Sequence, residues 1–358
     1  MLLCRNTLEN AAHNALWIEE DKDGFLFFRR FLPAQMEVYS EDLIPCLMTR
    51  CSTGVYLLFQ TTGNKLRLIC KKTSVIEILP TVLKDLGISK LIEMGKELKE
   101  NVKNYGNGQI SVEDSFDVFV DGIKIAEPKP KSGKIRISFK NPKHKLVTVK
   151  ICLPIFAEIG IKEIKCNGVT KAGDSTKEIM YCFGDSITQG FVAGSPSCSY
   201  TALLSDALNM DALNQGVGSY YYMAESLIGL ETLPVPKLIT VAYGTNDWTM
   251  MPDIETIRTN VQKYFNRLNT LFPNTPIFVI TPIWRGDMDV KQPSGFLEDV
   301  IELIENEALQ YANIKIINGL EISSHKSEDY ADGWLHPNKE GFAVMAKGIL
   351  DKINSYQI

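Results

Sequence analysis

The sequence lacks the signatures of several large classes of protein. No apolar run reaches the roughly 20 residues needed to cross a bilayer, so no transmembrane helix is predicted. The net charge of -5 indicates no basic surface for nucleic acid or anionic lipid. GxxxxGK[ST], which binds phosphate in many nucleotide hydrolases, is missing, as is the zinc motif HExxH. We therefore expect neither nucleic acid nor a membrane as a partner.

Cysteine pairs and a leader pattern are missing as well. The eight cysteines are scattered without a CxxC pair, which argues against a zinc knuckle or a thioredoxin-type redox site. Residues 1–30 lack a basic stretch followed by an apolar core, because Glu19, Glu20 and Asp21 interrupt them. We therefore expect reduced thiols and a cytoplasmic location.

The chain of 358 residues is long enough for two domains of ordinary size. Its content of 45% hydrophobic and 23% charged residues is typical of a soluble, well-cored protein. Turn-forming residues cluster at Asn167-Gly168 and Gly173-Asp174-Ser175, and the pattern of the chain changes there. We therefore predict two domains, residues 1–173 and residues 174–358.

The first half has the pattern of antiparallel β-structure. Residues 116–125 alternate apolar and polar side chains around Asp121-Gly122, which supplies the positive φ angles of a type I′ hairpin turn. Further strands are predicted at 55–61, 66–71, 134–139 and 146–153. This spacing predicts a β-sandwich of jelly-roll-like form. Residues 74–105 differ, because apolar residues recur there at helical spacing, and we interpret them as a helical insertion.

The second half alternates strands and helices. Short apolar runs are typical of parallel strands that are covered on both faces, and they occur at 178–183, 238–242, 277–281 and 314–317. Apolar residues at helical spacing predict helices at 200–209, 254–271 and 296–308. We therefore expect a three-layer α/β/α domain with a flavodoxin-like, doubly wound parallel sheet.

Four short segments carry residues suited to chemistry, and three of them directly follow a predicted strand, where ligands bind in open α/β sheets. They are Gly-Asp-Ser with Ser186, Gly-Val-Gly with Gly216, Gly-Thr-Asn-Asp with Asn246, and His-Pro-Asn with His336. A serine at a strand-to-helix turn exposes its hydroxyl, while a glycine N–H or a side-chain amide can donate to developing negative charge. Each segment alone is also compatible with a helix cap, a turn or a structural histidine.

Together and in this order, the four segments resemble the sequence blocks of the SGNH (GDSL) hydrolases, over roughly the second half of the chain. The resemblance implies acyl-ester hydrolysis without a metal or other cofactor. It makes Ser186 the nucleophile and His336 its general base. The N–H groups of Ser186 and Gly216 and the side chain of Asn246 would then form the oxyanion hole.

The third member of the triad departs from that family's pattern. The family usually places a carboxylate three residues before the histidine, but Gly333 occupies this position and Asp332 lies one residue further back. A local bulge would bring Asp332 to the imidazole of His336. The alternative is a Ser–His dyad in which a backbone carbonyl near Trp334 orients the ring. We favour Asp332, because a carboxylate stabilises the imidazolium that forms during attack.

The substrate is less well defined. A β-sandwich before an SGNH domain is similar to the arrangement in carbohydrate acetyl esterases. Asp185 and three tryptophans near the predicted site, Trp248, Trp284 and Trp334, are candidate substrate contacts, since aromatic faces suit sugar rings; the tryptophans could equally pack a domain interface. We expect a short acyl ester, most simply an acetyl ester, of a small molecule or an oligosaccharide.

Two alternatives remain open. One is a lysophospholipase or acyl-thioesterase of the same superfamily, and the other is a non-catalytic carbohydrate-binding relative. The sequence gives no indication of the oligomeric state.

Overall fold

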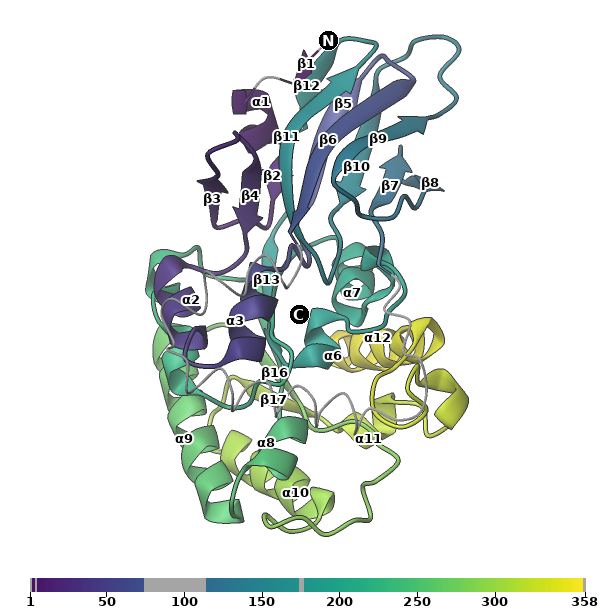
Figure 1. Cartoon of the computed structure of the whole chain (residues 1–358). Coiled ribbons are helices and arrows are strands. Elements are labelled where there is room, and N and C mark those ends of the chain that lie inside the picture. The colour runs from purple at the N-terminus through teal and green to yellow at the C-terminus, as the bar shows by residue number, and fades with distance from the viewer. Residues whose placement is uncertain (1, 4, 74–113, 174–176, 357–358) are drawn as a thin grey trace.

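The computed structural model describes residues 2–3, 5–73, 114–173 and 177–356. A β-sandwich built from the first half of the chain lies above an α/β domain built from the second half (Figure 1). The helix predicted at 74–105 lies outside the described residues, and so does the junction at 174–176. The insertion and the domain boundary therefore stay predictions.

The upper domain consists of two antiparallel six-stranded sheets. One has the order β3-β4-β11-β6-β9, with β1 beside β11, and the other has the order β12-β5-β10-β7-β8, with β2 beside β5. Apolar side chains such as Phe59, Leu68, Val149 and Ile161 form the core between them. The strands are β1 (Leu2–Leu3), β2 (Ala12–His13), β3 (Trp17–Glu20), β4 (Leu26–Arg29), β5 (Tyr56–Thr61), β6 (Lys65–Thr73), β7 (Asp117–Val120), β8 (Ile123–Ala126), β9 (Gly133–Ser138), β10 (Val147–Cys152), β11 (Glu158–Cys166) and β12 (Thr170–Ala172). The predicted sandwich is confirmed.

The predicted hairpin is present with its predicted turn. Asp121 and Gly122 join β7 to β8 with φ angles of 48° and 80°, as a type I′ turn requires. Strand β11 was not predicted. It pairs with β6, but the register shifts between Ile161 and Glu163, so the apolar and polar residues of β11 do not alternate regularly.

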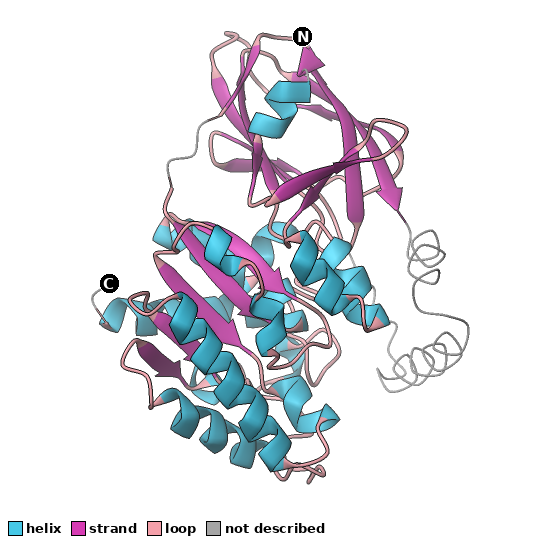
Figure 2. Cartoon of the chain, turned by 90° about the vertical axis from the view of Figure 1, so that its left-hand side faces the viewer, coloured by secondary structure: helices cyan, strands magenta, loops and turns pink. Residues whose placement is uncertain are grey.

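The lower domain is a five-stranded parallel sheet with the order β14-β13-β15-β16-β17. Helices α9 and α10 pack on Tyr181 and Phe183 on one face, and α7 and α12 pack on Met180 and Cys182 on the other. Figure 2 shows helices in front of this sheet, below the sandwich. The strands are β13 (Ile179–Gly184), β14 (Asp211–Gly216), β15 (Leu238–Ala242), β16 (Ile277–Ile280) and β17 (Ile314–Ile317). The order confirms the flavodoxin-like α/β/α fold, whose topological switch point lies between β13 and β15.

The helices of the lower domain follow the predicted periodicity. The predicted helices correspond to α7 (Tyr200–Leu208), α9 (Ile254–Leu271) and α10 (Leu297–Ala308). The other helical segments of this domain are α6 (Ser186–Gln189), α8 (Thr245–Met250), α11 (Gly319–Ile322), α12 (Lys339–Ser355) and the short 3-10 helices η1 (Pro196–Cys198), η2 (Ala224–Leu227), η3 (Leu230–Thr232) and η4 (Ser327–Asp329), whereas α1 (Arg5–Asn10) lies beside β11 and β12 of the sandwich. No helix in the described ranges is apolar over a length that could span a membrane.

Two helices from the first half of the chain lie against the lower domain (Figure 1). After β4 the chain forms α2 (Pro33–Tyr39) and α3 (Leu43–Arg50). Gln35 of α2 donates to Gln215 Oε1 at 2.9 Å and to the carbonyl of Ser226 at 2.8 Å. Phe31 and Tyr39 pack into the same core as the sheet of the lower domain. The first half of the chain therefore covers part of the α/β domain.

The turn of the β7–β8 hairpin offers a test of the fold. We expect Gly122→Val to lower the free energy of unfolding by about 1–2 kcal/mol, because a β-branched residue is strained at a φ of 80°. Urea denaturation measures the loss. The neighbouring Ile123 is 69% exposed, so Ile123→Thr should change the stability by less than about 0.5 kcal/mol. Equal stability of the two variants would contradict the assigned turn.

Candidate active site

The turn after β13 places Ser186 at the carboxyl edge of the parallel sheet. Strand β13 ends at Gly184, and helix α6 begins at Ser186. Asp185 caps this helix, because its Oδ1 accepts a hydrogen bond from the N–H of Ile187 at 2.9 Å. A Cβ on Gly184 would lie 2.0 Å from Thr188 Oγ1, so only glycine fits under this turn. Ser186 therefore stands beside the switch point of the sheet.

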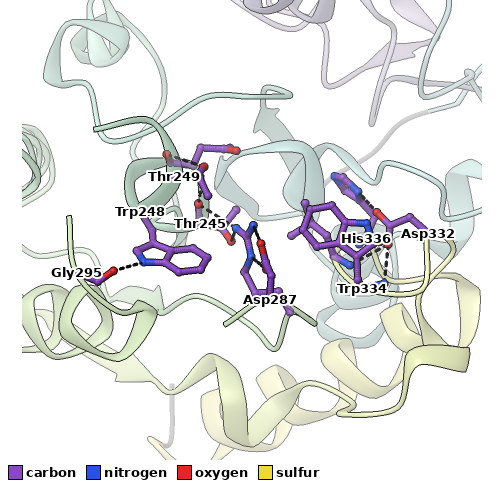
Figure 3. Close-up of polar contacts among 11 residues, drawn as sticks. Thr245, Trp248, Thr249, Asp287, Gly295, Asp332, Trp334 and His336 are labelled. Atoms are coloured by element: carbon purple, nitrogen blue, oxygen red, sulfur yellow. Dashed lines mark hydrogen bonds and ion pairs between the residues drawn. The ribbon is translucent and has the colours of Figure 1, made fainter. Parts of the chain in front are cut away.

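His336 and Asp332 extend from Ser186 as a continuous hydrogen-bonded relay. Ser186 Oγ lies 3.0 Å from His336 Nε2. His336 Nδ1 in turn lies 2.7 Å from Asp332 Oδ2 (Figure 3). The side chains of His336 and Asp332 are only 3% and 1% exposed. These are the distances and the order in which a serine can lose its proton to an imidazole that a carboxylate orients.

The backbone around Asp332 accommodates the additional residue before His336. Gly333 has a φ of 82°, which folds the loop back on itself. Asp332 Oδ1 then accepts the N–H groups of Trp334, Leu335 and His336 at 3.1, 2.8 and 3.0 Å. The carbonyl of Trp334 faces elsewhere and accepts the N–H of Gly286 at 2.7 Å. The geometry thus favours Asp332 over a backbone carbonyl as the partner of His336; its catalytic role stays a prediction.

The charge state of Asp332 follows from these contacts. Burial alone would raise the pKa of Asp332, but the His336 ring and the N–H groups of Leu335 and His336 lower this pKa to about 2. Asp332 is therefore ionised across the pH range in which an esterase works. A permanent carboxylate of this kind stabilises the imidazolium form of His336.

Two aromatic rings that the sequence did not single out lie beside the histidine. The ring of Phe191 meets that of His336 edge to face, with centroids 4.6 Å apart. Phe156, from the segment between β10 and β11, packs edge to face on Phe191, with ring centroids 4.9 Å apart. The sequence signal for Phe191 is its place two residues after helix α6. Phe156 carried no signal, because it comes from the first half of the chain.

The structure corrects the expected role of Gly216 as an oxyanion donor. Its N–H already donates to Asn214 Oδ1 at 2.9 Å. A Cβ on Gly216 would lie 2.3 Å from Gln189 N and 2.6 Å from Thr188 C. Gly216 is therefore required for the close approach of β14 to the turn that carries Ser186.

The backbone N–H of Ser219 is the donor in this loop that remains available for an oxyanion. Among residues 216–220, all of them described, its N–H alone has no hydrogen-bond acceptor. Ser219 has a φ of 60°, an unusual value for a residue other than glycine and one that often marks a functional site. Asn246 Nδ2 donates to the carbonyl of Tyr220 at 2.8 Å, which brings Asn246 to this loop. In the sequence, Ser219 was marked only by two nearby glycines.

Comparison with known proteins agrees with this geometry. Residues 182–344 match the family model of the GDSL-like lipases and acylhydrolases. This part of the chain belongs to that family. The lower domain is therefore that of a GDSL-family hydrolase. No curated protein sequence matches the chain.

Solved structures resemble this chain over nearly its full length. Salicylyl-acyltransferase SsfX3 from a tetracycline biosynthetic pathway has a TM-score of 0.74 and 18% identity, with 97% of this chain and 94% of that chain covered. A putative GDSL-like lipase from Bacteroides ovatus has a TM-score of 0.69 and 17% identity, covering 96% and 94%. A family two carbohydrate esterase from Cellvibrio japonicus has a TM-score of 0.63 and 15% identity, covering 98% and 96%. At these identities the likeness shows the shared fold.

Trp248 of the GDSL domain is a packing residue, which corrects the expectation that it contacts substrate. It is fully buried, and its Nε1 donates to the carbonyl of Gly295 at 3.0 Å (Figure 3). The guanidinium of Arg285 lies 4.6 Å from the Trp248 ring and 5.4 Å from the Trp334 ring. Arg285 also donates to the carbonyl of Thr245 at 3.2 Å. Arg285 thus joins the loop of Asn246 to the loop of His336.

Asp185, the polar candidate for contact with substrate, is likewise buried. It is 2% exposed and occupied by its helix cap, and burial raises its pKa to about 7. Trp284 is partly exposed and packs on Tyr330 with centroids 4.8 Å apart. Trp334 is also partly exposed and lies in the loop of the catalytic candidates, so it remains the stronger candidate for contact with substrate. No cluster of three or more His, Cys, Asp or Glu suited to a metal ion occurs among the residues described.

Replacing the carboxylate of Asp332 tests the relay. We expect Asp332→Asn to lower kcat for nitrophenyl acetate by about 10³- to 10⁴-fold, because a neutral amide cannot stabilise the imidazolium of His336. The matched control is Asp329→Asn in the same loop, whose carboxylate accepts the hydroxyl of Ser324. Near-normal turnover of Asp332→Asn would remove Asp332 from the triad.

Alanine substitutions separate the two possible roles of Gly216. Alanine keeps the N–H but adds a Cβ against backbone atoms of Gln189 and Thr188, so we expect Gly216→Ala to cost about 1–3 kcal/mol of stability. In Gly218→Ala the new Cβ would lie 3.3 Å from the flexible side chain of Met48, and the cost should be smaller. Thermal unfolding of both variants measures the difference. Full stability of Gly216→Ala would contradict the packing role.

Proposed function

We propose that the protein is a serine esterase that hydrolyses short-chain acyl esters, acetyl esters of carbohydrates first among them. The observation that carries the proposal is the relay from Ser186 through His336 to Asp332 at the carboxyl edge of the sheet. A hydroxyl 3.0 Å from an imidazole, itself 2.7 Å from a buried carboxylate, is arranged for nucleophilic attack on an acyl group.

In the first half of the proposed reaction, Ser186 Oγ bonds to the acyl carbon while its proton passes to His336 Nε2. Asp332, ionised at neutral pH, stabilises the resulting imidazolium. The N–H groups of Ser186 and Ser219 and Nδ2 of Asn246 donate to the negative oxygen of the tetrahedral intermediate. The alcohol then leaves with the proton held by His336. In the second half, water repeats these steps on the acyl-serine and releases the acid.

The surroundings of His336 support a small acyl group. The ring of Phe191 lies against the imidazole and that of Phe156 packs edge to face on Phe191, and both phenylalanines are partly exposed. Apolar rings at this distance suit a methyl group or the C–H face of a sugar. Trp334 lies two residues from both Asp332 and His336 and offers a further aromatic surface in the same loop.

The shared fold supports a carbohydrate alcohol. The esterase from Cellvibrio japonicus matches 98% of this chain, and thus residues of both of its domains. A family two carbohydrate esterase from Clostridium thermocellum, 14% identical with a TM-score of 0.60, was solved in complex with cellohexaose.

A substrate panel tests the proposed function. We expect hydrolysis of nitrophenyl esters to be fastest with acetate and to fall beyond butyrate, and acetate to be released from acetylated mono- and oligosaccharides. A rate that rises with acyl length would favour a lysophospholipase or thioesterase instead.

The serine provides the control for that panel. Ser186→Ala should abolish turnover, since no other group in the relay can form the acyl intermediate. A fluorophosphonate probe should label the wild type and fail to label Ser186→Ala. If the wild type neither turns over esters nor reacts with the probe, the protein is a non-catalytic relative and the proposed function fails.

A further inference from the structure

Arg30 is a buried cation that joins the two halves of the chain. It directly follows β4 of the sandwich and is only 1% exposed. Its Nε donates to the carbonyl of Cys51 at 3.1 Å and its Nη2 to that of Met48 at 2.9 Å. Its Nη1 donates to the carbonyls of Asn214 and Gly216, at 2.7 and 2.8 Å. One guanidinium thus holds four backbone carbonyls, two in each half of the chain.

The neighbouring Arg29 shows how unusual this arrangement is. Arg29 is equally buried, but it forms ion pairs with Glu19 and Glu158, each at 2.6 Å. Among the described residues, Arg30 has no carboxylate within ion-pair distance. Burial lowers the pKa of Arg30 to about 10, so the side chain still carries its charge at neutral pH. A buried charge without a counter-ion is costly unless its hydrogen bonds are complete.

Two of the carbonyls that Arg30 holds, those of Asn214 and Gly216, lie at the end of strand β14, which leads into the loop beside the nucleophile. The peptide between Gly216 and Val217 is fixed at both ends, because Arg30 binds its oxygen and the carbonyl of Gly184 accepts its N–H at 2.9 Å. Gln215 Nε2 donates back to the carbonyl of Arg30 at 2.5 Å. Arg30 and the strand that leads to Ser186 therefore clamp the same peptide from opposite sides.

We propose that Arg30 is a positioning residue for the oxyanion loop, residues 214–219, so that the N-terminal half of the chain sets the rate of the hydrolase. This inference rests on the proposed esterase function. Beyond the clamped peptide, Gly218 N–H donates to Gln189 Oε1 at 2.9 Å, which leaves the N–H of Ser219 to the substrate. The place of that N–H relative to Ser186 depends on the peptide that Arg30 holds.

The proposal predicts an effect on kcat and little effect on KM. The negative oxygen that the loop serves forms only in the transition state, so a displaced donor weakens transition-state binding and leaves substrate binding nearly unchanged. Displacement of a catalytic group by about 1 Å can cost about 100-fold in rate.

Matched lysine variants of the two arginines test this. Arg30→Lys keeps the charge but cannot hold four carbonyls with a fork of N–H groups. We expect it to lower kcat for nitrophenyl acetate by about 10- to 100-fold at similar KM. Arg29→Lys disturbs the ion pairs with Glu19 and Glu158 and a hydrogen bond to the carbonyl of Arg50, but no contact with residues 214–219, so it should lower the melting temperature while kcat is retained.

Chemical rescue separates positioning from folding. In Arg30→Ala, added guanidinium, at concentrations that leave the wild type folded, should restore part of kcat with saturation; Arg29→Ala should gain nothing.

Three outcomes would overturn the proposal. They are a folded Arg30→Lys with wild-type kcat, an equal loss of kcat in Arg29→Lys and Arg30→Lys, and failure of both Arg30 variants to fold, which would make Arg30 a folding residue only. An inactive wild type would instead reject the esterase function itself.

Discussion

The close approach of two backbone segments at the end of the parallel sheet is the constraint on which the site depends. Gly184 lets α6 turn directly against β15, and Gly216 lets β14 touch the first turn of α6. Both contacts exclude a Cβ, so the positions of Ser186 and of the oxyanion loop are set by main-chain packing. Because β13 and β14 pair in parallel, their carboxyl ends meet at one edge, and the loop of Asn246 joins them from β15.

The two halves of the chain act as one structure around that edge. Helices α2 and α3, from the first half of the chain, lie on the hydrolase domain. Phe156, also from the first half, packs on Phe191, which in turn packs on His336. Arg30 connects the two halves in the interior as well, because its hydrogen bonds join the end of β4 to β14. A buried guanidinium whose hydrogen bonds are all to carbonyls favours one geometry, because displacing a carbonyl leaves part of the buried charge without a hydrogen-bond partner.

Much of the architecture followed from local patterns. The Asp121-Gly122 hairpin, the helix at 254–271 and the apolar strands were predicted because each has a strong period or a turn residue with a definite φ. Strand β14 was missed because it carries Asp, Asn and Gln, which resemble a loop. These side chains are buried by partners from elsewhere: Asn214 donates to Thr188, and Gln215 donates to Arg30. No local pattern contains those contacts.

The sequence by itself determined the family, the fold of each half and the identity of Ser186, Asn246 and His336 as the chemical candidates, because ordered motifs and periodicity are local properties. Only the tertiary structure decided the rest. It brought Asp332 to His336 through a turn at Gly333, buried Trp248 and Asp185 away from solvent, and engaged the N–H of Gly216 with Asn214. Hydrogen bonds and burial join residues distant in the chain, so their outcome depends on how the whole chain packs.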